Sequence, residues 1–206
     1  SCFVDVNVRG SVAGTWNNII PTGNVTTTQG ATNTAPITGT LITTTFNNVP
    51  VTKSFNPTTI AAGGTSTVTI TINNTANANQ LNWVQLVDTF PTTPGAMTLV
   101  NPASATTTCT NPPTMTAVLT DLAGGSLTVG DTGIIMTMGT VPASSSCTIT
   151  FQVTASVTGT YTNTTGSFGN DQGATSTHTP DTLTVGAPDL TITKTASSTV
   201  AVGGNV

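Results

Sequence analysis

Three polar residues of this chain, Lys53, Asp88 and Asn163, combine types and positions that could support covalent chemistry. Each lies in a stretch where apolar and polar residues alternate, and alternate residues share one face of a β-strand. The apolar residues in phase with them are Val49, Val51 and Phe55 for Lys53, Val84, Leu86 and Phe90 for Asp88, and Tyr161 for Asn163. The pattern therefore predicts that all three polar side chains point into the core.

A lysine, a carboxyl group and an asparagine that meet in an apolar core can form an intramolecular isopeptide bond. Burying a lone ammonium group is costly unless it is paired or loses its proton. Neutral Lys53 would attack the carboxamide of Asn163 while protonated Asp88 polarises its carbonyl, and ammonia would leave. The alternative is a buried Lys53–Asp88 ion pair, with Asn163 hydrogen-bonded to the backbone. Both remain open, because a one-residue slip in strand register would turn any of these side chains outward.

The elements that must position these residues belong to an internal repeat with a period of about 140 residues, the size of one ordinary domain. The matching segments are residues 1–8 with 146–153, 14–18 with 159–163, 29–34 with 172–177, and 51–55 with 192–196. The repeat predicts that residues 1–48 are the closing strands of a preceding unit, 49–186 a complete unit, and 187–206 the opening strand of the next. Incomplete units expose strand edges, so both ends are expected to need neighbours.

The composition predicts an all-β fold. Threonine, valine and isoleucine are abundant, and β-branched residues suit strands better than helices. Short alternating runs recur about every 10 residues and are separated by turns rich in proline, glycine and asparagine. The sequence therefore predicts antiparallel immunoglobulin-like β-sandwiches in tandem.

The three cysteines indicate one disulfide in the complete unit. Cys147 matches Cys2 in the repeat, and Cys109 lies between them. A Cys109–Cys147 bond is expected, with the partner of Cys2 upstream of residue 1. Metal binding is the rival, but the chain has no Cys-x-x-Cys motif and one histidine. A disulfide would place the protein in an oxidising, extracellular setting.

The charge pattern argues against two classes of partner. Charged residues make up 5% of the chain and the net charge is −4, so it lacks the basic surface that nucleic-acid binding requires. No apolar run reaches the length of a transmembrane helix, so membrane insertion is not expected.

The order of motifs also resembles a known family. Residues 51–64 carry Thr-Lys followed by Gly-Gly, residues 87–91 read Val-Asp-Thr-Phe-Pro, and residues 159–164 read Gly-Thr-Tyr-Thr-Asn-Thr. This order resembles the DUF11-like "conserved repeat domain" modules, found in tandem in large secreted and cell-wall proteins of bacteria. The resemblance implies an Ig-like fold at a cell surface or in a fibre, and no catalytic activity. One departure is Phe90, where the family motif has leucine.

The remaining candidates for chemistry have simpler interpretations. His178 has no positioned nucleophile or carboxylate nearby in the sequence and is expected to be a surface strand residue. The aspartates are scattered and suit turns better than a calcium loop, so no metal or cofactor is expected. Trp16 and Trp83 lie in strand-like stretches and are expected to pack in the core or at its rim rather than to bind sugar.

Together, these features predict a non-enzymatic structural repeat of an extracellular bacterial filament or cell-surface stalk. Its expected partners are neighbouring repeats in a covalent array, or identical subunits that donate strands to one another. The matching phase of residues 1–48 favours the array. The alternative function is an adhesin or carbohydrate-binding surface module, which the small number of aromatic residues makes weaker (6 Phe, 2 Trp and 1 Tyr). Any glycan ligand is left open.

Overall fold

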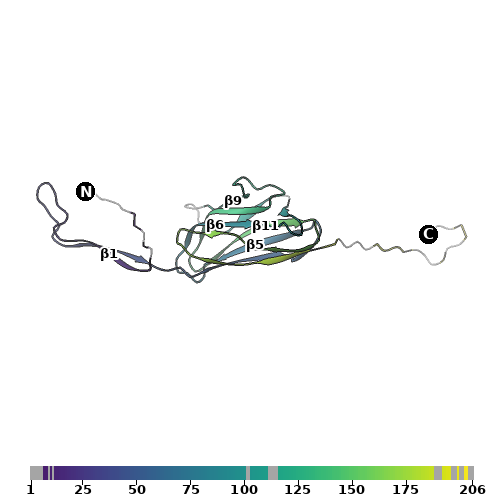
Figure 1. The fold of residues 1–206 in the computed structure, drawn as a ribbon, viewed down its shortest axis with the longest axis horizontal. Helices are drawn as coiled ribbons and strands as arrows, with labels where there is room; N and C mark the ends of the chain where they lie inside the picture. Colours follow the sequence, from purple (N-terminus) through teal and green to yellow (C-terminus); the bar gives the residue numbers. More distant parts are fainter. Residues whose placement is uncertain are drawn as a thin grey trace.

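The computed structural model describes residues 7–8, 10, 12–100, 103–110, 116–187, 192–195, 199 and 202–203. Figure 1 shows an elongated molecule with a β-sandwich at its centre. The strands are β1 (Gly14–Ile20), β2 (Ile37–Thr43), β3 (Val49–Asn56), β4 (Thr59–Ala61), β5 (Thr65–Asn73), β6 (Leu81–Thr89), β7 (Met97–Leu99), β8 (Ala105–Thr107), β9 (Val118–Thr120), β10 (Gly133–Val141), β11 (Ser146–Ala155), β12 (Gly159–Asn163), β13 (Phe168–Gly169), β14 (Ser176–Thr179) and β15 (Asp181–Gly186). The predicted all-β fold is confirmed.

The sandwich is built from three sheets around one core. The largest sheet has the order β14-β3-β5-β11-β7, and β8 also pairs with β11. The second has the order β13-β6-β10-β9, and the third has the order β12-β15-β4. Buried apolar residues from all three sheets form a single cluster. Across it, the rings of Phe90 and Phe151 stack with their centroids 5.4 Å apart.

The alternation of residue types explains why these strands face the core as they do. In β5 and β11 every second residue is buried, and the residues between them are mostly threonines that are half-buried. The two strands pair antiparallel over their full shared length, from Ser146 opposite Asn73 to Thr154 opposite Thr65. Their aliphatic side chains therefore form one continuous apolar face, which supplies much of the hydrophobic driving force for folding.

Two strand pairs depart from the predicted antiparallel arrangement. β14 runs parallel to β3, and β15 runs parallel to β4. Antiparallel partners can be joined by a tight hairpin, whereas parallel partners need a longer crossover connection. After β12 the chain crosses to the sheet of β3 and then returns to pair with β12, so both late strands lie alongside early ones. The prediction of a wholly antiparallel sandwich was therefore wrong in these two pairs.

The segments outside the sandwich have their own arrangement. β1 and β2 form a separate two-stranded hairpin at one end of the molecule (Figure 1). Among residues 187–206, the described ones lie outside any strand. None of the described residues belongs to a helix long and apolar enough to cross a membrane.

Candidate functional site

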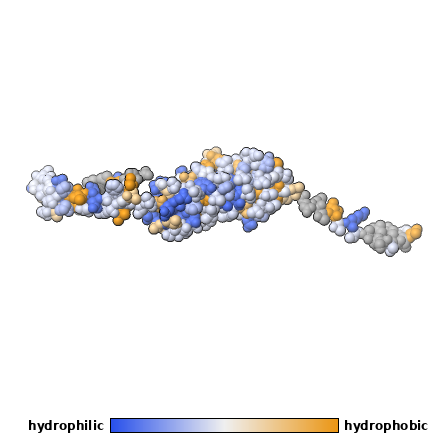
Figure 2. Space-filling view, turned by 60° about the horizontal axis from the view of Figure 1, so that its bottom comes forward, coloured by the Kyte–Doolittle hydropathy of each residue, from blue (hydrophilic) through white to orange (hydrophobic). Residues whose placement is uncertain are grey.

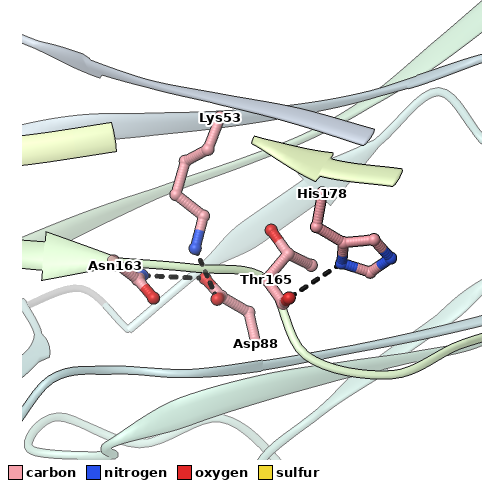
Figure 3. Close-up of polar contacts among 5 residues, drawn as sticks. All are labelled: Lys53, Asp88, Asn163, Thr165 and His178. Carbon is pink, nitrogen blue, oxygen red and sulfur yellow. Dashed lines mark hydrogen bonds and ion pairs between the residues drawn. The ribbon is translucent and has the colours of Figure 1, made fainter. Parts of the chain in front are cut away.

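Lys53 is a buried lysine in the middle of β3. The strand alternates strictly, and Lys53 occupies a core-facing position between Val51 and Phe55. The whole residue is 7% exposed, and its side chain is fully buried. Its Nζ atom lies 2.5 Å from Oδ1 of Asp88 (Figure 3). The ammonium group is therefore removed from water and forms an ion pair with the carboxylate of Asp88.

Asp88 lies near the end of β6, in the sheet that faces β3 across the core. It is fully buried and stands opposite Ile134 of β10. Its second oxygen, Oδ2, accepts a hydrogen bond of 3.2 Å from Nδ2 of Asn163 (Figure 3). The carboxyl group thus bridges the lysine and the asparagine.

Asn163 is the last residue of β12 and is 1% exposed. It follows the buried Tyr161 at the next core-facing position. Its carbonyl oxygen, Oδ1, is buried and has no hydrogen-bond partner among the described residues. An unsatisfied buried carbonyl costs free energy and is uncommon in folded proteins. A half-turn of the carboxamide exchanges Oδ1 and Nδ2 at nearly the same positions and would let a protonated Asp88 donate to Oδ1.

Burial shifts the pKa values of both groups of the pair toward their neutral forms. Burial lowers the pKa of the Lys53 ammonium group, and the nearby Asp88 offsets only part of that effect. Burial likewise raises the pKa of Asp88, again with partial compensation from Lys53. Transfer of a proton across this short contact, from Nζ of Lys53 to Oδ1 of Asp88, would give a neutral amine and a neutral carboxylic acid. These are the protonation states that nucleophilic attack on an amide needs.

Lys53, Asp88 and Asn163 come from three different sheets. β3 belongs to the largest sheet, β6 to the second and β12 to the third. The site therefore sits where all three sheets meet, and a covalent bond between Lys53 and Asn163 would connect strands that share no backbone hydrogen bonds. A second polar group lies beside it, made of Thr165, which was not singled out from the sequence, and His178, which was expected at the surface and is partly buried.

This neighbouring group is formed by Thr165 and His178 (Figure 3). His178 in β14 is partly buried; its Nδ1 lies 2.8 Å from the backbone carbonyl of Thr165 and its Nε2 lies 2.7 Å from Oγ of Ser176. The hydroxyl of Thr165 is buried and has no partner among the described residues. The signal that could have found Thr165 is its parity, because it follows Asn163 by two residues.

The two cysteines of the complete unit are joined. Cys109 and Cys147 are buried at 0% and 1% exposure, with Sγ atoms 2.01 Å apart and Cα atoms 5.0 Å apart. Cys147 is the second residue of β11, and Cys109 follows β8, which pairs with β11. The disulfide therefore joins the segment after β8 to β11, an inner strand of the largest sheet. Cys2 lies outside the described residues.

Three other residues lie at the surface. Lys194, the repeat copy of Lys53, is exposed in this chain. Trp16 in β1 is 50% exposed and Trp83 in β6 is 51% exposed, so neither ring belongs to the core. Among the described residues there is no group of histidine, cysteine and acidic side chains that could hold a metal ion.

Comparison with known proteins gives a family but not a function. A family model described as a domain of unknown function, DUF7933, matches residues 50–185. The chain belongs to the DUF7933 family. The match covers the sandwich and includes Lys53, Asp88 and Asn163. The finer resemblance of this DUF7933 unit to DUF11-like modules stays a prediction, as does its arrangement in tandem. No curated protein matches the chain.

Solved structures similar to the DUF7933 chain include two cohesin modules. One is from a family 33 glycoside hydrolase of Clostridium perfringens, with 9% identity, a TM-score of 0.48, and coverage of 68% of this chain and 98% of that one. The other is the seventh ScaB type I cohesin of Pseudobacteroides cellulosolvens, with 17% identity, a TM-score of 0.44, and coverage of 73% and 100%.

A third similar structure is a protein of Corynebacterium diphtheriae proposed to be membrane anchored. It has 10% identity and a TM-score of 0.42, and the match covers 86% of this chain and 44% of that one. Identities and TM-scores at this level transfer no function to the DUF7933 chain.

The pH dependence of the stability of a Lys53 variant tests the buried charges directly. In Lys53→Met, Asp88 keeps its burial, which raises its pKa, but loses the ammonium group that lowers it. Its folded-state pKa then lies above the ordinary value of 3.8, so its contribution to stability is fully present below 3.8 and is lost as the pH rises through the folded-state pKa. We expect the free energy of unfolding to fall by about 1.4 kcal/mol per pH unit in that window, measured by urea titration.

The control for this experiment is the double variant Lys53→Met with Asp88→Asn, which has no titrating group at the site and should show no such slope. Greater stability of Lys53→Met at neutral pH than at pH 4 would contradict the prediction.

Proposed function

We propose that this chain is a structural segment of an extracellular bacterial filament or cell-surface stalk, whose DUF7933 unit carries an isopeptide bond between Lys53 and Asn163. The observation that carries the proposal is the buried set of Lys53, Asp88 and Asn163, in which one carboxyl group contacts both the amine and the amide. Such a set has no evident use in binding a ligand, since its members are withdrawn from the surface.

The proposed reaction consumes no co-reactant. Proton transfer from Lys53 to Asp88 frees the Nζ lone pair, which attacks Cγ of Asn163 while protonated Asp88 donates a hydrogen bond to Oδ1. A bond forms between Nζ and Cγ, the bond between Cγ and Nδ2 breaks, and Nδ2 leaves as ammonia with a proton delivered through Asp88. Water is kept out by the surrounding core, which protects the nucleophile and strengthens the electrostatic stabilisation.

The bond would suit a mechanical role. β3 is the first strand of the sandwich and β12 is among the last, so the cross-link would let tension pass between the two ends of the unit without unzipping the sheets between them. The Cys109–Cys147 disulfide lies elsewhere and would protect a different part of the sandwich. The Cys109–Cys147 disulfide supports an oxidising location, which is the basis for proposing an extracellular setting. The proposed partners are neighbouring repeats or identical subunits of a fibre.

Intact mass measured on the reduced, denatured chain tests the proposal. We expect a mass lower than that of the sequence by one ammonia, and one digestion product that contains both Lys53 and Asn163. Lys53→Ala and Asp88→Ala should have the full sequence mass. Asn74→Ala, which removes another fully buried asparagine, should retain the deficit. A full mass for the unchanged chain, with separate peptides for Lys53 and Asn163, would leave only the buried ion pair.

The alternative role in carbohydrate binding has one specific observation in its favour. The half-exposed Trp83 lines a shallow pocket with Gln85, Asn170 and Asp171, and an aromatic ring flanked by amide and carboxyl groups can stack on a sugar and hydrogen-bond its hydroxyls. Saturable binding on a glycan array that is lost in Trp83→Ala would support this second role.

A further inference from the structure

The hairpin outside the sandwich reproduces the register of two strands inside it. β1 pairs with β2 so that Trp16 lies opposite Leu41 and Asn18 opposite Gly39. β12 pairs with β15 so that Tyr161 lies opposite Leu183 and Asn163 opposite Asp181. The glycines that open both first strands also correspond, since Gly14 lies opposite Thr43 and Gly159 opposite Val185. Two strand pairs far apart in the chain thus have the same register, and Asn18 occupies the position in the hairpin that corresponds to Asn163.

The two strand pairs differ in what covers them. Tyr161 and Leu183 are fully buried, and Asn163 is 1% exposed. In the hairpin, Trp16 is 50% exposed, and Asn18 is exposed as well. Two isoleucines on the same face, Ile20 and Ile37, are 40% and 52% exposed. Figure 2 shows hydrophobic patches on the hairpin at the end of the molecule. This face of the hairpin therefore corresponds to a face that is buried in the sandwich, but here it is exposed.

The sandwich shows what covers such a face. Tyr161 and Leu183 belong to the cluster that also contains Phe55 of β3 and Leu86 of β6. The complementary surface is thus the portion of a unit from β3 to β11, with its lysine and aspartate. The sandwich of a second copy of this chain has no vacant place, because its own β12 and β15 already fill it. The remaining occupant is one further unit of the same repeat, N-terminal to the hairpin in the same polypeptide.

We propose that Asn18 is the amide member of a second cross-linking site, completed when the hairpin docks on the β3-to-β11 portion of a preceding unit. This rests on the proposed function of the first site. Nζ of the lysine at the position of Lys53 in that unit bonds to Cγ of Asn18, the bond between Cγ and Nδ2 of Asn18 breaks, and ammonia leaves with a proton delivered by the aspartate at the position of Asp88. The core of each unit in the array is then completed by the strands equivalent to β12 and β15, which follow the second cysteine of that unit in the sequence.

An extended chain tests this inference. Residues 49–145, which span β3 to β10, are added ahead of Ser1. Ser1 matches Ser146 in the repeat, so the start of the present chain is expected to supply the strand that corresponds to β11 and to complete a second β3-to-β11 portion. The expected mass is lower than the sequence mass by two ammonia molecules, against one for the present chain. Asn18→Ala in the extended chain should reduce the mass deficit from two ammonia molecules to one. The matched control is Asn17→Ala, which removes the neighbouring asparagine on the opposite face of β1, where it accepts a hydrogen bond from Thr40.

Trp16 provides a readout of docking that does not depend on the bond. In a Trp83→Phe background, Trp16 is the only tryptophan in the present chain, and it is half exposed. The extended chain with Trp83→Phe in both copies should show a blue-shifted emission from Trp16, because docking would bury it as Tyr161 is buried. An unshifted emission would overturn the docking.

The outcomes separate this inference from the proposed function. A deficit of one ammonia in the extended chain, unchanged by Asn18→Ala, would overturn the second site and leave the first intact. A deficit of none in either chain would overturn both cross-links. A deficit of two that falls to one only in Asn18→Ala supports the second site.

Discussion

Asn163→Ala is expected to lower the free energy of unfolding by about 5 kcal/mol through loss of the cross-link, because the bond would close a loop of 163 − 53 = 110 residues and so restrict the unfolded chain. The hydrogen bond from Nδ2 of Asn163 to Asp88 does not add to this loss, because Nδ2 leaves as ammonia when the cross-link forms. Guanidinium chloride titration of the reduced proteins measures the difference and keeps the disulfide out of the comparison.

Asn74→Ala is the matched control for this prediction. Asn74 is also fully buried, and its Nδ2 donates hydrogen bonds to the carbonyl oxygens of Asn79 and Pro142. Its loss should cost only the hydrogen-bonding contribution, about 1–3 kcal/mol. Equal losses in Asn163→Ala and Asn74→Ala would indicate that Asn163 acts through hydrogen bonds alone and that no covalent bond constrains the unfolded state.

Removing the disulfide is expected to have the second-largest effect. The Cys109–Cys147 bond spans 38 residues in sequence, and closing a loop of this length stabilises a domain by about 3–4 kcal/mol on the chain-entropy model. The double variant Cys109→Ala with Cys147→Ala should lose this amount in a denaturant titration under oxidising conditions.

Reductant supplies the control for the disulfide. It should destabilise the unchanged chain by a similar amount and leave the double variant unaffected. Thiol labelling of the unfolded, unreduced protein should modify neither Cys109 nor Cys147. Modification of both would contradict the disulfide, and the argument for an extracellular location would lose its basis.

The sequence alone determined which residues face the core wherever alternation is unbroken. Lys53 lies between apolar residues at two-residue spacing, and Asn163 follows Tyr161 at the same spacing, so their direction follows from strand geometry. The all-β class likewise follows from β-branched residues and turn signals. These features are local, and a local pattern can be read without knowledge of the strand order.

Alternation does not predict the core-facing residues where an irregularity interrupts the two-residue period of the strand. The register between β6 and β10 shifts near Trp83, which has a φ angle of 52°, and Leu81 and Val84 are both buried although three residues apart. An irregularity of this kind resets the parity of the strand, so the ring of Trp83 lies half exposed. Asp88 was predicted correctly to face inward because its parity was counted from Val84, after the shift.

Only the tertiary structure decided which inward-facing groups meet. Parity predicts that a side chain is buried but not against which partner, and the parallel pairings of β14 and β15 arise from crossovers that leave no local signal. The arrangement of three sheets brings Lys53, Asp88 and Asn163 together from β3, β6 and β12. The same arrangement leaves the repeat copy of Asn163, Asn18, exposed on a hairpin, because burial depends on the strands that cover a face as well as on the residues that form it.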